Sequence, residues 1–228
     1  MSDPSFGEVE ACVFDAYGTL FDVHSAAARM KDELGEKADA LSEMWRHKQL
    51  QYTWLRSLMG RHEDFWQVTG EALDYSMRAL GMENDGLRAK LMELYLQLDA
   101  YPEVIDVLTQ LKDSGMKTAI LSNGEPSMLI AAAKSANIYS LLDGVLSIEK
   151  VGIFKPHPST YQIAVDELKV AANHISFQSS NGWDAHGAAA FGFVVAWVNR
   201  FDQPRENLPA GPHAEIKTLS DLPDLLSL

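Results

Sequence analysis

The sequence has a single cysteine and few basic residues, which excludes several functional classes. Cys12 is the only cysteine among 228 residues, so the chain has neither an internal disulfide nor a metal site built from several cysteines. Lysine and arginine total 19 against 32 acidic residues, giving a formal net charge of -13. No cluster of basic residues stands out, so nucleic acid is not an expected partner. An anionic substrate would need a local cationic pocket.

Long apolar runs are also lacking. No segment approaches the run of about 20 apolar residues that a membrane-spanning helix needs, so no membrane partner is expected. The first ten residues, MSDPSFGEVE, do not have the basic start and apolar stretch of a signal peptide. Together with a lone cysteine in an apolar run, where we expect it to be buried, these features predict a cytoplasmic protein.

Short apolar runs rich in strand-forming residues alternate with helical patterns along most of the chain. We expect strands at 10–15, 117–123, 144–149, 175–181 and 193–199, with a short strand within 214–219. Helical patterns cover 102–115, 126–138, 158–170 and 184–192. This alternation predicts an α/β protein with a Rossmann-like parallel sheet buried on both faces.

Residues 21–98 interrupt the alternation. They contain helical periodicity and no convincing strand, which predicts a helical cap domain inserted after the first strand. The catalytic core is then expected to consist of residues 1–20 and 99–228.

Polar clusters follow four of the expected strands. The first strand leads into Asp15-Ala-Tyr-Gly-Thr19 and the second into Ser122-Asn123-Gly124. Lys155-Pro156 follows the third, and Ser179-Ser-Asn-Gly-Trp-Asp184 follows the fourth. Because ligands bind outside the carboxyl ends of parallel strands, we expect these side chains to form one site.

The order DxxGT, SN, KP and a final acidic motif resembles the haloacid dehalogenase superfamily. Most of its members are magnesium-dependent phosphatases whose first aspartate is a nucleophile. Two departures from the phosphatase pattern stand out. Tyr17 replaces the second aspartate of DxDxT, and SSNGWD leaves one clear carboxylate, Asp184. Because magnesium prefers several oxygen ligands, we expect no metal site and no cofactor.

These departures are themselves the pattern of a subfamily. DAYGTLFDVHS, WRHKQLQYTWLRSLMG, LSNG, KPHPSTY and SSNGWD resemble the type II L-2-haloacid dehalogenases over nearly the whole chain. The resemblance implies hydrolysis of short L-2-haloalkanoic acids to 2-hydroxy acids and halide, with inversion at C2 and no metal. It also implies an ester intermediate on Asp15 that water hydrolyses, and a homodimer.

The resemblance carries a set of residue roles. The catalytic residues that it implies are Asp15, Thr19, Arg46, Lys155, Ser179, Asn181 and Asp184. The substrate-binding residues that it implies are Ala16, Tyr17, Arg46, Leu50, Phe65, Ser122, Asn123, Tyr161 and Trp183. Lys155 is expected to keep Asp15 ionised, because an adjacent cation lowers a carboxyl pKa. Arg46, from the cap, is expected to receive the leaving halide.

Several alternatives stay open at this point. The group that activates the hydrolytic water could be Asp184, Asn181 or His186, although a histidine at the start of a helix is usually exposed. His47, next to Arg46, could face the pocket. A magnesium-dependent phosphatase of the same fold and a catalytically silent binding protein are the competing functions, because a fold does not determine chemistry.

Overall fold

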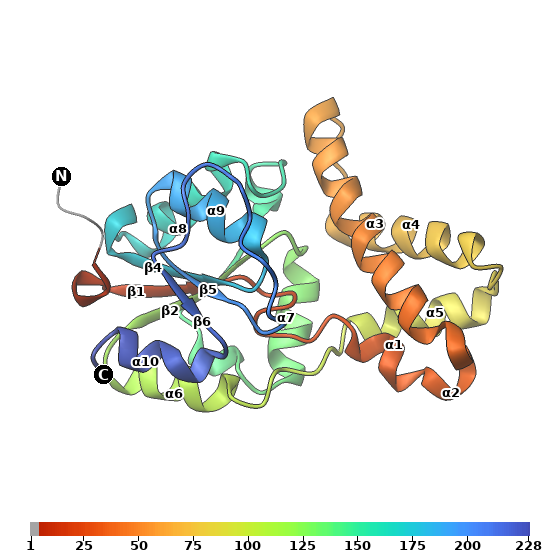
Figure 1. The fold of residues 1–228 in the computed structure, drawn as a ribbon, viewed down its shortest axis with the longest axis horizontal. Coiled ribbons are helices and arrows are strands. Elements are labelled where there is room, and N and C mark those ends of the chain that lie inside the picture. Colours follow the sequence, from red (N-terminus) through yellow and green to blue (C-terminus); the bar gives the residue numbers. More distant parts are fainter. Residues whose placement is uncertain (1–4) are drawn as a thin grey trace.

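The computed structural model describes residues 5–228 and is built around one six-stranded parallel sheet (Figure 1). The strands are β1 (Ala11–Phe14), β2 (Lys117–Ser122), β3 (Gly144–Ser147), β4 (Ile175–Ser179), β5 (Val194–Val198) and β6 (Ala214–Ile216). Their order across the sheet is β3-β2-β1-β4-β5-β6, and every pairing is parallel. The predicted α/β fold and all six predicted strands are confirmed.

Helices cover both faces of the sheet, because the side chains of each strand alternate between two apolar cores. Cys12 and Phe14 belong to one core, and Ala11 and Val13 belong to the other. The flanking helices are α6 (Val104–Asp113), α7 (Pro126–Ser135) and α10 (Leu222–Leu225) on the first face, and α8 (Pro158–Leu168) and α9 (Gly182–Phe191) on the second. The short 3-10 helices are Phe6–Glu8, Gly35–Lys37, Tyr139–Leu141, Ile148–Lys150, Ala172–His174 and Leu219–Asp221.

Five further helices lie together beside the sheet (Figure 1). They are α1 (Ser25–Arg29), α2 (Lys31–Leu34), α3 (Ala38–Met59), α4 (Phe65–Ala79) and α5 (Asp85–Tyr95). Asp64 and Asn84 cap the starts of α4 and α5 by accepting hydrogen bonds from backbone N–H groups. None of the helices described within residues 5–228 is long and apolar enough to cross a membrane.

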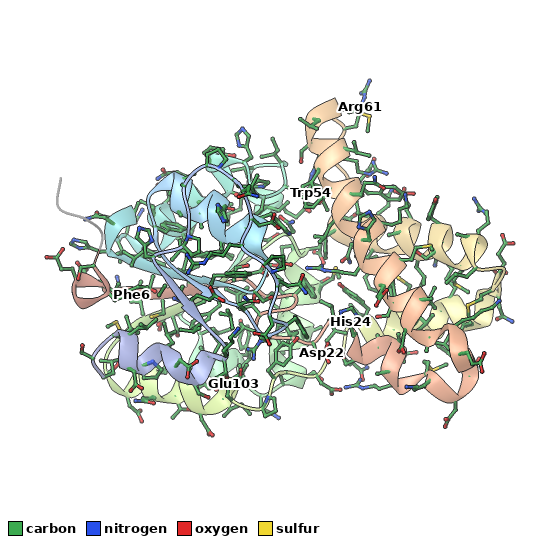
Figure 2. All side chains as sticks on the ribbon, in the orientation of Figure 1. Phe6, Asp22, His24, Trp54, Arg61 and Glu103 are labelled. Atoms are coloured by element: carbon green, nitrogen blue, oxygen red, sulfur yellow. The ribbon has the colours of Figure 1, made fainter. Side chains whose placement is uncertain are left out.

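Two chain segments connect the sheet to these five helices, and they run side by side. The N–H of Asp22 donates to the carbonyl of Asp99 at 2.8 Å, and the N–H of Tyr101 donates to the carbonyl of Leu20 at 3.0 Å. Figure 2 shows Asp22 at this junction. The pairing holds both connections next to the turn that follows β1.

Cys12 offers a direct test of the fold. Its side chain is fully buried, and burial raises the pKa of the thiol to about 12. We expect the native protein to be inert to a thiol-specific reagent at about pH 8, because only the thiolate reacts. The denatured chain should react at one thiol, which an absorbance assay measures. Reaction of the native protein as fast as that of the denatured chain would contradict the buried position of β1.

Candidate active site

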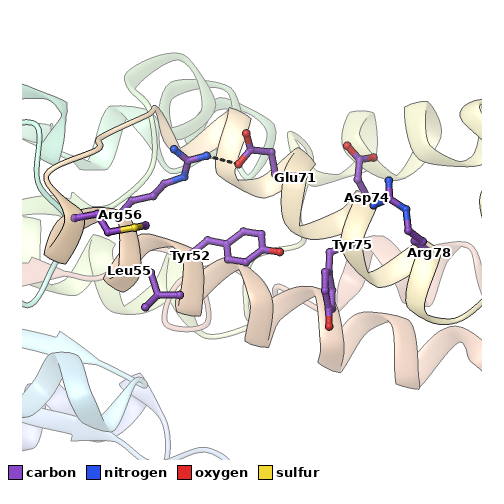
Figure 3. Close-up of a pocket in the computed structure, with 8 residues that line it drawn as sticks. Tyr52, Leu55, Arg56, Glu71, Asp74, Tyr75 and Arg78 are labelled. Atoms are coloured by element: carbon purple, nitrogen blue, oxygen red, sulfur yellow. Dashed lines mark hydrogen bonds and ion pairs between the residues drawn. The ribbon is translucent and has the colours of Figure 1, made fainter.

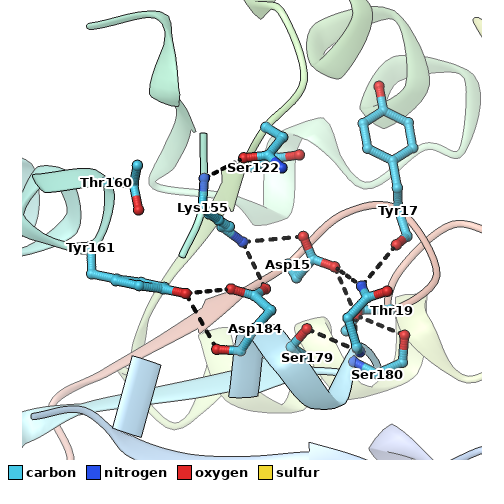
Figure 4. A network of polar contacts seen from close by, with 12 residues as sticks. Asp15, Tyr17, Thr19, Ser122, Lys155, Thr160, Tyr161, Ser179, Ser180 and Asp184 are labelled. Atoms are coloured by element: carbon cyan, nitrogen blue, oxygen red, sulfur yellow. Dashed lines mark hydrogen bonds and ion pairs between the residues drawn. The ribbon is translucent and has the colours of Figure 1, made fainter. Parts of the chain in front are cut away.

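Asp15 is the first residue after β1, and both of its carboxylate oxygens meet donors (Figure 4). Oδ1 lies 3.2 Å from Nζ of Lys155. Oδ2 accepts hydrogen bonds from Nδ2 of Asn181 at 2.8 Å and from the hydroxyl of Thr19 at 3.3 Å. The residue is only 6% exposed. Charge-assisted hydrogen bonds of this kind hold a carboxylate in one orientation.

Lys155 lies between two carboxylates. Its Nζ is 2.9 Å from Oδ2 of Asp184, in addition to its contact with Asp15, and Lys155 and Asp184 are both almost completely buried. Tyr161 donates from its hydroxyl to Oδ1 of Asp184 at 2.7 Å. Asn123 accepts from the backbone N–H of Lys155 at 3.0 Å, which fixes the loop that carries the lysine. Residues from the ends of β1 and β2, the loop after β3 and helix α9 thus meet at one edge of the sheet.

The charges of this cluster shift the pKa values of its members. Burial alone lowers the pKa of Lys155, but Asp15 and Asp184 outweigh it and raise the pKa above its ordinary value. Burial raises the pKa of Asp184, and the charge of Asp15 adds to this effect, while Lys155 and Tyr161 oppose it. Lys155 is therefore an ammonium ion at neutral pH, and Asp184 is a stronger base than an ordinary aspartate.

The turn after β1 brings two chain segments into close contact. Gly18 has φ of +96°, and a Cβ atom there would lie 3.0 Å from the hydroxyl of Ser180. The hydroxyl of Thr19 accepts from the N–H of Ser180 at 2.8 Å, and Ser179 accepts from the N–H of Asn181 at 3.2 Å. Ser180 was not among the predicted site residues. The motif SSNGWD contains it, but the sequence does not show which of the two serines faces Thr19.

One arginine crosses from the cap to this site. Arg46, on α3, donates from Nη2 to the carbonyl of Tyr17 at 3.1 Å and to Oδ1 of Asn181 at 3.2 Å. It lines a cavity of about 350 Å³ together with Leu50, Asn181 and Trp183. The structure thus brings a cation from the cap next to the amide that holds Asp15.

Four other predicted residues form or support the walls. The ring of Tyr17 lies 5.4 Å from that of Phe65, centroid to centroid. Trp183 packs edge-on against Trp54, which sequence reasoning did not single out. Ser122 accepts from the N–H of Gly124 at 3.1 Å and so shapes the turn after β2.

Four further residues differ in their burial. Ala16 and Tyr161 are fully buried, where Ala16 accepts backbone hydrogen bonds and Tyr161 contacts Asp184. His186 is only 8% exposed, so the expectation of an exposed histidine at the start of α9 was wrong. It lines a separate cavity with Pro156 and Leu208, and its ring also lies close to Gly211. His47 is exposed, and the described residues that line the cavity beside Arg46 do not include it.

The donor set does not fit a magnesium ion. Within residues 5–228, no group of three or more His, Cys, Asp or Glu side chains could hold a metal. Each carboxylate oxygen of Asp15 and Asp184 already accepts a hydrogen bond from a protein donor. At the position of the phosphatase acid, Tyr17 is buried, and burial together with Tyr95 and Asp15 raises its pKa well above the ordinary value. Such a phenol is a poor proton donor.

Comparison with known proteins agrees with this arrangement. Residues 9–192 match the haloacid dehalogenase-like hydrolases. The chain belongs to this family. It is 46% identical to (S)-2-haloacid dehalogenase 4A of Burkholderia cepacia, over 96% of this chain and 95% of the relative. It is 44% identical to (S)-2-haloacid dehalogenase 1 of Pseudomonas sp. strain CBS-3, over 96% of both chains.

A solved member of the family shares the fold. L-2-haloacid dehalogenase from Xanthobacter autotrophicus, with chloropropionic acid covalently bound, superimposes with a TM-score of 0.90. The two sequences are 37% identical, and the alignment covers 96% of this chain and 98% of that one. The predicted superfamily and subfamily are therefore confirmed.

The buried lysine supplies a test of the site's electrostatics. Lys155→Met leaves Asp15 and Asp184 without their shared cation, so we expect the free energy of unfolding to fall by about 3 kcal/mol near pH 7. The pKa of Asp184 is already raised and should rise further. The folded state then binds protons more tightly than the unfolded state, so stability should recover as the pH falls below neutral.

Urea unfolding at several pH values measures this effect, with Lys150→Met as the matched control. Lys150 forms an exposed ion pair with Glu167, and its loss should cost less than about 1 kcal/mol. Equal destabilisation by the two substitutions would contradict the assignment of Lys155.

Proposed function

We propose that this chain hydrolyses short L-2-haloalkanoic acids to 2-hydroxy acids, with inversion at C2. The observation that carries the proposal is the arrangement around Asp15. Its carboxylate is held by Lys155, Thr19 and Asn181, and a cap arginine donates to the amide oxygen of the same asparagine. The (S)-2-haloacid dehalogenases named above, which are similar over almost their entire length, support the same reaction.

In the first step, a carboxylate oxygen of Asp15 attacks C2 of the substrate. The carbon–halogen bond breaks on the opposite side, and its electron pair leaves with the halide, so C2 is inverted. Lys155 and the backbone N–H groups near Ser122 and Asn123 bind the substrate carboxylate. Arg46 stabilises the negative charge that grows on the halogen, because a cation placed in advance lowers the energy of the transition state.

In the second step, water attacks the ester carbonyl carbon of Asp15. The bond between this carbon and the ester oxygen attached to C2 breaks. That oxygen, which came from Asp15, leaves with the product and gains a proton, and Asp15 keeps an oxygen from water. We assign the transfer of the water proton to Asp184. Its raised pKa makes it a better base than an ordinary aspartate, and Lys155 links it to Asp15. His186, which lines a different cavity, is disfavoured for this role.

The site is less well suited to the competing functions. A phosphatase leaving group needs a proton, and Tyr17 is a poor donor, whereas a halide leaves without one. A silent binding protein would have no need for the hydrogen bonds that orient both oxygens of Asp15. We propose two domains: a cap formed by residues 21–98, which supplies Arg46, and a catalytic core formed by residues 1–20 and 99–228.

The outer face of α3 and α4 is the surface that we propose for a homodimer. Figure 3 shows Tyr52 and Leu55 of α3 beside Tyr75 of α4 on this face. Leu55, Met59 and Tyr75 line this face, and all three are exposed. Exposed apolar side chains gathered on one face are typical of a protein interface, and the family resemblance implies the same assembly.

Isotope labelling tests the ester step. With enzyme in excess over substrate in water enriched in oxygen-18, the first turnover should yield a 2-hydroxy acid without label, because its new oxygen comes from Asp15. The label should appear in the peptide that contains Asp15, as a gain of about 2 Da by mass spectrometry. Label in the product of the first turnover would show direct attack by water on C2.

A chelator distinguishes dehalogenation from metal-dependent chemistry. Halide release from L-2-chloropropionate should be unchanged by EDTA or added magnesium, because protein donors already bond every carboxylate oxygen of Asp15 and Asp184. An ion-selective electrode measures the release, with D-2-chloropropionate as the control for stereochemistry. Loss of activity in EDTA that magnesium restores would support the phosphatase-like alternative.

A further inference from the structure

The guanidinium of Arg46 is held by three uncharged oxygens. Nη1 donates to Oε1 of Gln49 at 2.8 Å, and Nη2 donates to the carbonyl of Tyr17 and to Oδ1 of Asn181. Arginine has only donors, so the acceptors around it determine its direction. Because these acceptors carry no charge, they orient Arg46 without cancelling its positive charge.

Gln49 lies at the centre of a buried polar cluster in the cap. It is 1% exposed, and its Nε2 donates to the hydroxyl of Thr69 at 2.7 Å. The hydroxyl of Tyr95 lies 3.0 Å from Nε2 and 3.2 Å from Oε1. Helices α3, α4 and α5 each contribute one member, so the cluster links the three longest cap helices around Arg46.

Thr69 determines which way the amide of Gln49 faces. Its hydroxyl donates to the carbonyl of Phe65 at 2.6 Å, which uses its only hydrogen. Thr69 must therefore accept from Gln49, which directs the amide nitrogen toward Thr69 and the oxygen toward Arg46. A reversed amide would place its N–H donors against the guanidinium.

We propose that Gln49, fixed by Thr69 and Tyr95, is a positioning residue that aims Arg46 at the departing halide and leaves its charge intact. This inference rests on the proposed dehalogenation. A carboxylate at position 49 would bind Arg46 strongly but would neutralise it. An apolar side chain would keep the charge but lose the direction. The amide meets both requirements.

The aim of Arg46 matters because Asn181 connects it to the nucleophile. Oδ1 of Asn181 accepts from Arg46, and Nδ2 of the same amide donates to Oδ2 of Asp15 at 2.8 Å. A rotation of Arg46 would move the cation away from Asp15 and from the carbon that Asp15 attacks. The resulting loss of rate should be greatest when chloride leaves, because chloride is the poorer leaving group and depends more on stabilisation of its developing charge.

Three variants test the proposal. Q49E adds a charge next to Arg46, Q49M removes the acceptor at similar size, and S76A is the matched control. Ser76 is a fully buried residue of α4, and among residues 5–228 its hydroxyl bonds only the carbonyl of Ala72. The measurements are bromide affinity by tryptophan fluorescence, kcat and KM with L-2-chloropropionate and L-2-bromopropionate, and the melting temperature.

Q49E should bind bromide at least about fivefold more weakly and lose at least about tenfold in kcat on the chloride substrate, with a smaller loss on the bromide substrate. Q49M should bind bromide better than Q49E. Like Q49E, it should lose more kcat on the chloride substrate than on the bromide substrate. S76A should lower the melting temperature and leave bromide affinity and the ratio of the two rates unchanged.

Two results would overturn the role of Gln49. One is bromide affinity in Q49E equal to that of the unaltered protein. The other, decisive even if Q49E does not fold, is an unchanged chloride-to-bromide rate ratio in Q49M. If the unaltered protein releases no halide, the proposed function fails, while the bromide affinities still decide the position of Arg46.

Discussion

The buried ammonium of Lys155 is the constraint on which the rest of the site depends. Two carboxylates as close as Asp15 and Asp184 cannot both remain ionised in a desolvated pocket unless a cation lies between them. The fold meets this requirement by drawing the three groups from β1, the loop after β3 and α9. Two further hydrogen bonds support this arrangement. Asn123 accepts from the backbone N–H of Lys155, and Tyr161 donates to Oδ1 of Asp184.

The sheet positions the nucleophile and the cap positions the arginine, and the two parts of the chain are fixed in different ways. Residues at the strand ends are fixed by the parallel ladder, which suits a nucleophile that must not move. Arg46 comes instead from a cap helix. The cap is joined to the sheet by two chain segments that pair through the backbone at Asp22–Asp99 and Leu20–Tyr101. Its direction is determined from two sides. Gln49, fixed by Thr69 and Tyr95, holds Nη1 inside the cap, and Tyr17 and Asn181 hold Nη2 at the core.

The sequence was sufficient to predict the sheet and most of the site, because those features depend on local patterns. Apolar runs gave the six strands, and the polar residues after them gave Asp15, Lys155 and Asp184. Gln49, Tyr95 and Ser180 were missed because their contacts join residues distant in sequence, and a buried glutamine looks like any other polar residue of a helix. The burial of His186 was missed for the same reason, since the residues around it, Pro156, Leu208 and Gly211, are distant in sequence.

The substrate and product are anions, and this limits how many negative groups can lie near Arg46. The chain has a net charge of -13, and the proposed substrate and its halide product are both anions. Asp15 and Asp184 contribute two negative charges at the site, and Lys155 and Arg46 contribute two positive ones, so the site is close to neutral before substrate binds. A further carboxylate near Arg46 would give the site a net negative charge, and the site would then repel an anion. Neutral acceptors around the arginine are therefore what allows an acidic protein to bind and release anions at this position.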